Sequence, residues 1–434
     1  MGKVLIITYY WPPAGGGGVQ RWLKFARYLP EHGWEPVVYT PSNADYPLLD
    51  PTLAQEIPDA VQVIKQPIRE PRRVYRRLLG KQQGGEGKAA TLDQMFYTDP
   101  KRRSWKQSLG IWIRGNLFIP DARVWWVRPS VRFLQKFLKE ESITTIITTG
   151  PPHSMHLIGL GLKHKHRTLR WLADFRDPWT AIEYYDKMPL TRRADRVHRR
   201  LEQQVLQYAD AVTTVSPAWA NMLGASRGRE VGVLTNGYDP ADFTSPAPPL
   251  DEQVTICHVG TLALDRNPRQ LWRLLSALAP QFGFEVVVKL LGSTDPAVLD
   301  SIEAAGLAYE DLGYLDHEAA IRAMRSAHFL LLLVNKAVAE NVRGRIPGKL
   351  FEYLAARRPV ICVSQVQTDA TAILARHGHL VVDPDDPAAG KALRSFIGDP
   401  PKVTDQPPEE YSRPYLARQL ASTLSRLSEQ HPNH

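Results

Sequence analysis

The sequence predicts an α/β protein made of two doubly wound domains, each built on a parallel sheet. Its 434 residues suit two or three domains of ordinary size. Short apolar runs rich in β-branched residues alternate with longer helical patterns along nearly the whole chain, as repeated β-α-β units do. A segment dense in proline and polar residues, 239–253, separates these runs into two series. Two domains of similar size are the simplest interpretation.

The expected elements follow in chain order. The strands expected in the first series are residues 3–10, 35–40, 61–66, 144–150, 169–175, 210–216 and 231–237. Those expected in the second series are residues 254–262, 284–292, 309–315, 328–334, 358–364 and 379–383. We therefore expect a first domain at 1–240, a linker at 241–253, a second domain at 254–405 and a helical tail at 406–434. The tail carries an apolar stripe that needs a partner surface, for which the first domain is one candidate.

Composition excludes several classes of protein. Only two cysteines occur, Cys257 and Cys362, and both lie in strand-like apolar runs, so neither a disulfide framework nor a cysteine metal site is expected. No apolar run approaches the roughly 20 residues of a membrane-spanning helix. The start of the chain shows neither a signal peptide nor a myristoylation motif, which makes the cytoplasm the expected location.

Positive charge is concentrated between Lys65 and Lys139. This stretch holds 18 Lys or Arg and five Asp or Glu, a balance of +13, whereas the whole chain carries +9. Such charge suits anionic lipid, a phosphorylated substrate or nucleic acid. Nucleic acid is disfavoured because no recognised binding motif accompanies the charge. The interleaved aromatic residues favour a membrane interface, although a solvated face with its aromatic rings turned into the core would give the same pattern. These residues are Trp105, Trp112, Phe118, Trp125 and Trp126.

Four glycines, Gly15–Gly18, separate the first expected strand from a helix. Glycine lets a ligand approach the backbone closely, and the N-terminus of the following helix attracts anions. Gly16 and Gly17 are therefore candidate phosphate-binding residues. The spacing matches neither a Walker A motif nor the G-x-G-x-x-G fingerprint, so a plain flexible turn stays open.

Polar residues follow the fourth and fifth expected strands. His153 comes after Gly150, and Asp174, Arg176 and Asp177 close the next strand. The carboxyl ends of parallel strands lie at one edge of a sheet, so these side chains should converge near the glycine loop. We take His153, Arg176 and Asp177 as candidate catalytic residues. The alternatives are a loop histidine and a structural ion pair among Asp174, Arg176 and Asp177.

The second half repeats this arrangement. Arg266 lies in a strand-to-helix turn, and Pro347 and Lys349 begin a later helix that also carries Glu352. An anion at that helix N-terminus would meet the helix dipole and the Lys349 ammonium together, which leaves Glu352 to accept a hydrogen bond from a sugar hydroxyl. From the pattern alone, solvated surface residues are the favoured interpretation of Lys349 and Glu352. No motif for a metal site or for hydrolysis is found.

Taken in order, these motifs resemble the retaining glycosyltransferases of family 4, which have the GT-B architecture of two Rossmann-like domains facing a central cleft. The resemblance extends over almost the whole chain. It rests on YYWPPAGGGGVQR, TTGPPHSMH, ADFRDPW, HVGTLALDRNP and PGKLFEYLAARRPVI, at residues 9–21, 148–156, 173–179, 258–268 and 347–361.

The resemblance implies a role for each candidate residue. Glu352 would bind the donor ribose, Lys349 and Arg266 would face the donor diphosphate, and Gly16 and Gly17 would lie next to the donor phosphate or the acceptor. Three positions depart from the family pattern. Position 344 is glycine instead of the first of two paired glutamates, Thr261 replaces a usual cation, and Arg176 replaces a usual histidine.

The resemblance thus implies a metal-independent, retaining hexosyltransferase without a cofactor. It would move a sugar from a nucleotide-diphosphate donor to a glycan or lipid-linked acceptor in cell-surface polysaccharide synthesis. Residues 65–139 would contact an anionic membrane from the cytoplasmic side. The alternatives are a GT-B sugar-nucleotide epimerase or phosphorylase, and a non-catalytic sugar-nucleotide-binding membrane scaffold.

Overall fold

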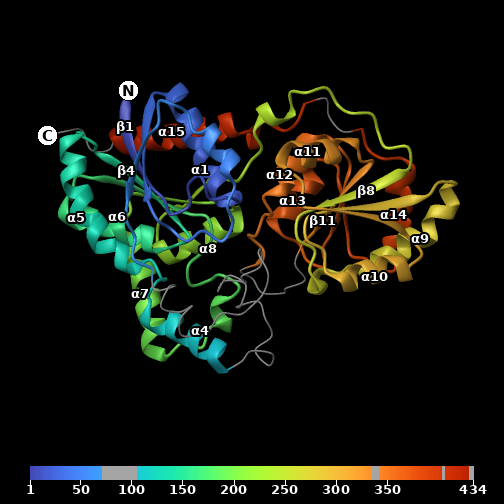
Figure 1. The fold of residues 1–434 in the computed structure, drawn as a ribbon, viewed down its shortest axis with the longest axis horizontal. Helices are drawn as coiled ribbons and strands as arrows, with labels where there is room; N and C mark the ends of the chain where they lie inside the picture. The colour runs from blue at the N-terminus through green and yellow to red at the C-terminus, as the bar shows by residue number, and fades with distance from the viewer. Residues whose placement is uncertain (71–104, 335–341, 403–405, 430–434) are drawn as a thin grey trace. The chain divides into compact units, whose positions relative to one another are not determined.

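A computed structural model describes residues 1–70, 105–334, 342–402 and 406–429. The chain forms two compact units (Figure 1). The first unit consists of residues 1–235 and 416–434, and the second consists of residues 236–415. Each is described by itself below.

The first unit is built on a parallel sheet of seven strands. Their order is β3-β2-β1-β4-β5-β6-β7, which is the order of a doubly wound Rossmann-like sheet extended by one strand. The strands are β1 (Gly2–Ile7), β2 (Trp34–Pro41), β3 (Gln62–Gln66), β4 (Thr145–Gly150), β5 (Arg170–Phe175), β6 (Ala211–Thr214) and β7 (Gly232–Val233).

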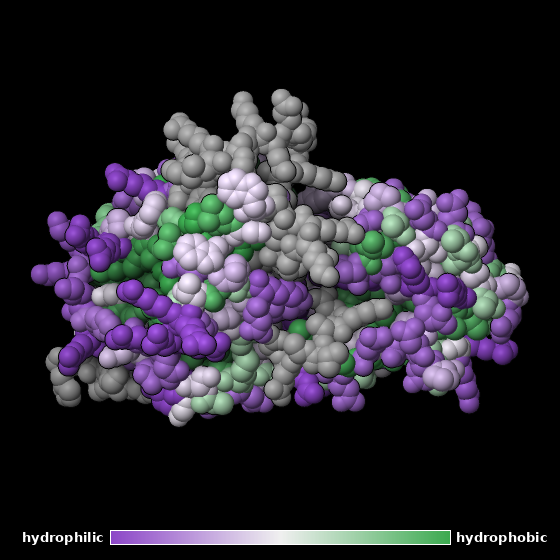
Figure 2. All heavy atoms as spheres, turned by 90° about the horizontal axis from the view of Figure 1, so that it is seen from below, coloured by the Kyte–Doolittle hydropathy of each residue, from purple (hydrophilic) through white to green (hydrophobic). Residues whose placement is uncertain are grey.

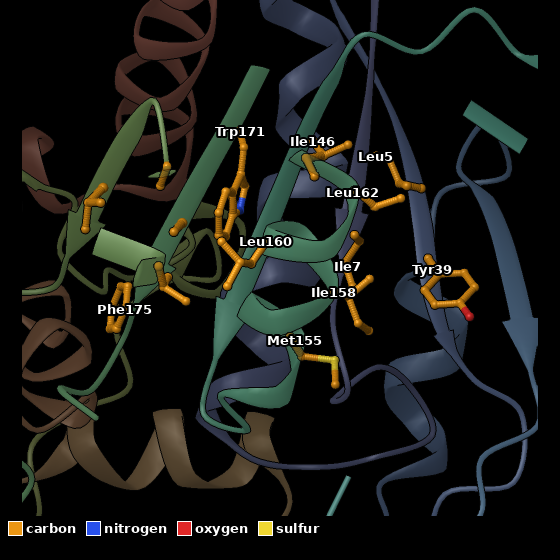
Figure 3. Close-up of a cluster of buried hydrophobic side chains, with 14 of the residues drawn as sticks. Leu5, Ile7, Tyr39, Ile146, Met155, Ile158, Leu160, Leu162, Trp171 and Phe175 are labelled. Atoms are coloured by element: carbon orange, nitrogen blue, oxygen red, sulfur yellow. The ribbon is translucent and has the colours of Figure 1, made fainter. Parts of the chain in front are cut away.

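Helices cover both faces of this sheet, and the alternation along β1 shows why. Leu5 and Ile7 are buried on one face, whereas Val4 and Ile6 are buried on the other, so the strand is apolar throughout. Figure 3 shows α6 packed on the Leu5 side of the sheet. The helices are α1 (Gly17–Tyr28), α4 (Trp105–Leu117), α5 (Val124–Glu140), α6 (Ser154–Lys165), α7 (Arg192–Tyr208) and α8 (Pro217–Arg227).

The last helix, α15 (Arg413–Glu429), packs on the first unit. Leu416, Leu420, Leu424 and Leu427 recur on one helix face and are buried with Val4, Ile6 and the apolar side of α1. The apolar stripe of the tail thus lies in the core of the unit that contains the start of the chain.

The second unit repeats the design with six parallel strands in the order β10-β9-β8-β11-β12-β13. Its strands are β8 (Val254–Val259), β9 (Val286–Leu291), β10 (Ala308–Gly313), β11 (Phe329–Leu333), β12 (Val360–Val363) and β13 (Leu380–Val382). Helices α11 (His317–Ser326), α12 (Lys349–Ala356) and α13 (Asp369–Arg376) contribute to the core on one face. Helices α9 (Arg269–Phe282), α10 (Pro296–Ala304) and α14 (Ala389–Gly398) contribute to the core on the other.

The predicted fold class, two doubly wound parallel sheets, is confirmed. Each of the thirteen expected strands is present, although β7 keeps only two of its seven expected residues. The structure assigns residues 236–253, which include the expected linker, to the second unit. Tyr238 explains this assignment, because its backbone N–H donates to Tyr411 and its carbonyl accepts from Arg413.

Candidate functional site

Each sheet reverses its strand order at one point, and the candidate residues follow the strands at these points. The reversal lies between β1 and β4 in the first sheet and between β8 and β11 in the second. In open α/β sheets, ligands bind beyond the carboxyl ends of the strands at such a point. Gly16 and His153 follow β1 and β4, whereas Arg266 and Lys349 follow β8 and β11.

The Lys349 side chain lies at the carboxyl end of β8. Lys349 is the first residue of α12, and its Nζ donates to the carbonyl oxygen of Val259 at 2.5 Å and lies 3.4 Å from His258 Nε2. A Cβ added to Gly260 would lie 3.2 Å from this ammonium, and Gly260 has a φ of 110°. Glycine is therefore required at this turn, both for its backbone conformation and for the approach of Lys349.

The surroundings of Lys349 disfavour its positive charge. Burial, and then the positive charge of Arg266, lowers the pKa of Lys349 to about 7, while Glu352 opposes the shift. Burial and the neighbouring Lys349 likewise lower the pKa of His258 to about 3, which leaves that ring neutral. An anion bound here would favour the charged lysine. Groups perturbed in this way are common at functional sites.

Glu352 lies in the first turn of α12 and is partly buried. Burial, and then the negative charge of Asp242, raises the pKa of its carboxyl group, while His317 opposes the shift. No hydrogen bond joins this carboxylate to the part of the chain that the structure describes. Glu352 therefore has the capacity to accept hydrogen bonds from a ligand.

Arg266 ends the short 3₁₀ helix η6 (Leu264–Arg266) and is partly buried. Its guanidinium makes no hydrogen bond or ion pair with the described residues. Its positive charge acts on Lys349 and His258, as their lowered pKa values show. The structure thus brings Lys349, Arg266 and Glu352 into one neighbourhood of the second unit. Thr261 is exposed near this neighbourhood and supplies no charge.

The glycine loop of the first unit lies at the N-terminus of α1. Gly16 has a φ of 96° and provides no side-chain cap, and Gly17 is the first residue of the helix. A Cβ on Gly18 would overlap the Arg176 guanidinium, which also donates to the carbonyl oxygen of Pro151. The loop glycines therefore admit a cation beside the positive end of a helix dipole, an arrangement that attracts anions.

His153 is buried, and its ring makes no hydrogen bond to the described residues. Only 6% of the residue is exposed, and neither ring nitrogen has a partner among the described residues. Its ring stacks on Trp179 with the centroids 5.1 Å apart. Burial, and then the neighbouring His156, holds the pKa of His153 well below its usual range, so the ring is neutral. A loop histidine in solvent is excluded by this burial.

Asp174 has a structural role, and its partner differs from the one the sequence suggested. Both carboxylate oxygens accept from Arg21, at 3.2 and 2.9 Å, and Thr149 and Thr213 complete the shell at 3.1 and 3.0 Å. Arg21 and Asp174 are completely buried. The suggested ion pair of Asp174 with Arg176 is therefore wrong, because Arg21 occupies the carboxylate. Asp177, the neighbour of Arg176, is partly buried.

No group of metal-ligating side chains suited to a metal ion occurs among the described residues. In the same part of the chain, no helix combines the length and the apolar character needed to cross a membrane.

Comparisons with known proteins address the fold. No protein-family model and no curated protein matches the sequence. Among solved structures, a glycosyltransferase from Rickettsia africae superposes with a TM-score of 0.60 at 10% identity, and the match covers 99% of each chain. Anabaena Alr3699/HepE, solved with UDP and glucose, gives 0.54 at 15% identity and covers 99% of this chain and 98% of its own.

An epimerase-like protein shares the same fold. A protein from Listeria monocytogenes assigned as a UDP-N-acetylglucosamine 2-epimerase gives a TM-score of 0.56 at 11% identity, and the match covers 99% of this chain and 97% of that one. The fold of this chain is therefore that of the GT-B glycosyltransferases. At these identities, the likeness extends to the fold.

Proposed function

We propose that the protein is a glycosyltransferase that uses a nucleotide-diphosphate sugar as donor. One observation carries the proposal: Lys349, Arg266 and Glu352 gather where the second sheet reverses its strand order. Two of these groups are cations that repel each other without a ligand, and the third is a carboxylate without a hydrogen-bond partner among the described residues. A diphosphate joined to a ribose would satisfy all three.

The chemistry requires the glycosyl phosphate bond to break, so negative charge grows on the departing diphosphate. Lys349 and Arg266 stabilise that charge in a partly buried setting, where fixed cations act more strongly than in water. The N-terminus of α12 adds a positive dipole end. These groups supply the stabilisation without a metal ion. We propose retention of anomeric configuration, with the leaving phosphate accepting the proton of the acceptor.

The acceptor would bind at the carboxyl edge of the first sheet. Arg176 offers a cation beside the glycine loop, and Asp177 follows it in the chain. In our proposal Asp177 orients the acceptor hydroxyl, and His153 provides a neutral ring beside it. Support for the role of His153 comes from its ring nitrogens, which have no hydrogen-bond partner among the described residues and which a packing role in the core does not require.

Thermal shift against a panel of nucleoside diphosphates and their sugars tests the donor site, because a ligand that binds only the folded state raises its melting temperature. We expect a shift with one nucleobase, and we expect Lys349→Gln or Glu352→Gln to reduce it. Lys391→Gln and Glu303→Gln change exposed residues of the same unit and should retain the shift. A panel without any stabilising nucleotide would refute the proposal.

Donor turnover separates the transferase from its alternatives. An epimerase with the same fold would return an altered nucleotide sugar and release no nucleoside diphosphate. A transferase should hydrolyse its donor slowly when the acceptor is absent, because water replaces the acceptor. If the wild type releases the nucleoside diphosphate and Lys349→Gln does not, the result would support transfer. It would also exclude a non-catalytic scaffold. Isomerised donor alone would establish the epimerase.

We also propose that the first unit contacts an anionic membrane from the cytoplasmic side. In α4, Trp105, Leu109 and Trp112 lie at i, i+4 and i+7 and are 71%, 47% and 38% exposed. Figure 2, which shows the face on the α4 side, has pale and green side chains there among the purple ones. An exposed apolar helix face of this kind is unusual unless it binds something.

Helix α5 supplies charge that complements such a membrane. Its exposed stripe begins at Trp125, 53% exposed, and continues with Arg128, Arg132, Lys136 and Lys139. Residues 105–139 hold seven Lys or Arg and one Asp, a balance of 7 − 1 = +6. Tryptophan with lysine and arginine is typical of helices that lie in a lipid interface. The other half of the basic stretch, 71–104, lies outside the described residues.

Co-sedimentation with vesicles tests this contact. Binding should require phosphatidylglycerol in the vesicle and should weaken with salt, because the attraction to the surface is screened. Trp112→Ala with Trp125→Ala should reduce binding, and the exposed Arg394→Ala of the second unit should not. Absence of binding at low salt would remove the membrane contact and leave the donor site untouched.

A further inference from the structure

A pocket of about 250 Å³ opens at the carboxyl edge of the second sheet. Residues that follow β11, β12 and β13 form one side of it, and the segment leading into α9 forms the other. Arg266 lines the pocket and also acts electrostatically on Lys349, so the pocket borders the proposed donor diphosphate site.

Three arginines line this pocket, namely Arg266, Arg269 and Arg273. Arg269 and Arg273 are separated by one turn of α9, where like charges repel each other. None of the three guanidiniums makes a hydrogen bond or ion pair with the described residues. Three neighbouring cations that form no ion pair with the described residues favour the binding of an anion.

The acidic residue of the pocket does not neutralise these arginines. Asp385 accepts a hydrogen bond from Gln365 Nε2 at 3.0 Å, and its own N–H donates to Asp383. It forms no salt bridge with an arginine among the described residues. The lining therefore has three positive charges and one negative charge.

The segment that carries the arginines is held in place by Asn267. This residue is 7% exposed. Its amide nitrogen donates to Ser301 at 2.7 Å, and its amide oxygen accepts from the Trp272 ring at 2.9 Å. Arg266 and Arg269 flank this anchored residue and Pro268, so their backbone is fixed before any ligand arrives. The side chains of Arg269 and Arg273 are themselves exposed, and Arg266 is partly buried.

We propose that this pocket binds an acidic substituent of the substrate, a carboxylate or a phosphate, beside the donor diphosphate. The inference rests on the proposed donor site and specifies its substrate class. Arginine matches both oxyanions, since its planar fork donates two parallel hydrogen bonds. The volume falls just below the roughly 300–1,000 Å³ of pockets for drug-sized ligands, which suits a single sugar with one charged group.

Calorimetric titration of matched ligand pairs tests the inference. UDP-glucose with UDP-glucuronate, and GDP-mannose with GDP-mannuronate, differ only in a carboxylate on the donor sugar. Glucose and its phosphate monoester, each titrated in the presence of the nucleoside diphosphate, test a phosphate on the acceptor. We expect the acidic member of at least one pair to bind about tenfold tighter, as charge-assisted hydrogen bonds would give.

Variants decide whether the pocket causes the preference. Arg269→Ala combined with Arg273→Ala should abolish it and leave the affinity for the free nucleoside diphosphate nearly unchanged, because Arg266 and Lys349 remain. Arg394→Ala removes the same charge from an exposed position outside the pocket and should keep the preference. Equal affinity within every pair would overturn this inference and leave the proposed donor site standing. A preference for the acidic ligand that survives the double variant would do the same. Failure of every nucleotide to bind would overturn the donor site as well.

Discussion

The two units place charged residues at the same edge of their sheets but treat them differently. In the first, Asp174 and Arg21 are completely buried and satisfy each other, with two threonines and two carbonyl groups completing the network. In the second, Lys349, Arg266 and Glu352 are only partly buried, and the two cations repel each other. A closed network indicates a structural role, whereas neighbouring charges that form no ion pair with one another indicate a place for a ligand.

The largest expected effect is on the closed network. Arg21→Met would leave the Asp174 carboxylate buried without its cation, and we expect a loss of about 3–5 kcal/mol in the free energy of unfolding. Arg199→Met breaks an exposed pair with Asp195 and should cost less than about 1 kcal/mol. Calorimetric unfolding measures both. Equal losses would show that the buried network is not specially important to the first unit.

The next effect concerns Lys349 and pH. Its pKa of about 7 means that the side chain is charged below that pH and largely neutral above it when no ligand is bound. A diphosphate prefers the charged form, so binding should take up a proton above about pH 7, and affinity should fall as pH rises. Calorimetry with a nucleotide sugar in buffers of different ionisation enthalpy measures this uptake.

Lys349→Gln is the matching variant for that experiment. It should bind about tenfold more weakly near pH 7 and should show no proton uptake, because charge-assisted hydrogen bonds are lost with the ammonium. The same proton uptake in wild type and variant would assign the titration to another group.

A smaller effect on stability is expected at His153, and it distinguishes a catalytic role of this residue from a packing role. A buried polar group without a hydrogen bond costs about 1–3 kcal/mol, so His153→Phe should stabilise the protein by about 1 kcal/mol. If the ring serves catalysis, donor turnover should fall at the same time. His156→Phe is the control, since His156 Nδ1 lies 2.8 Å from Thr148 Oγ1 and its loss should destabilise. If the His153 variant is stabilised and keeps full donor turnover, His153 has a packing role and no catalytic role.

The smallest effect is expected in the glycine loop. Gly17→Ala places a Cβ with no atom within 4 Å, so stability should change by a few tenths of a kcal/mol or rise slightly. Gly16→Ala forces a side chain to a φ of 96° and should cost about 1 kcal/mol or more. Thermal unfolding compares the pair. Weakened ligand binding in Gly17→Ala would show that a ligand approaches the backbone there.

The sequence was sufficient for the architecture because strands and helices leave a local periodic signal. The apolar runs predicted both parallel sheets, whereas the proposed roles of Lys349, Arg266 and Glu352 came from the resemblance of the motifs to a family. Pairings across long separations leave no such signal. Arg21 and Asp174 lie 153 residues apart, and neither residue type indicates the other. The pocket of Arg269 and Arg273 was missed for the same reason, since charges on a helix surface acquire meaning only when distant loops enclose them.

The last helix, α15, belongs to the first unit although it follows the second unit in the chain, and this has a practical consequence. The chain passes from the first unit to the second after residue 235 and returns after residue 415, and backbone hydrogen bonds from Tyr238 to residues 411 and 413 join the two passages. A fragment that stops at residue 235 would lack α15 and would leave an apolar face of its core open to water. Separate production of the first unit therefore calls for grafting residues 416–429 onto it.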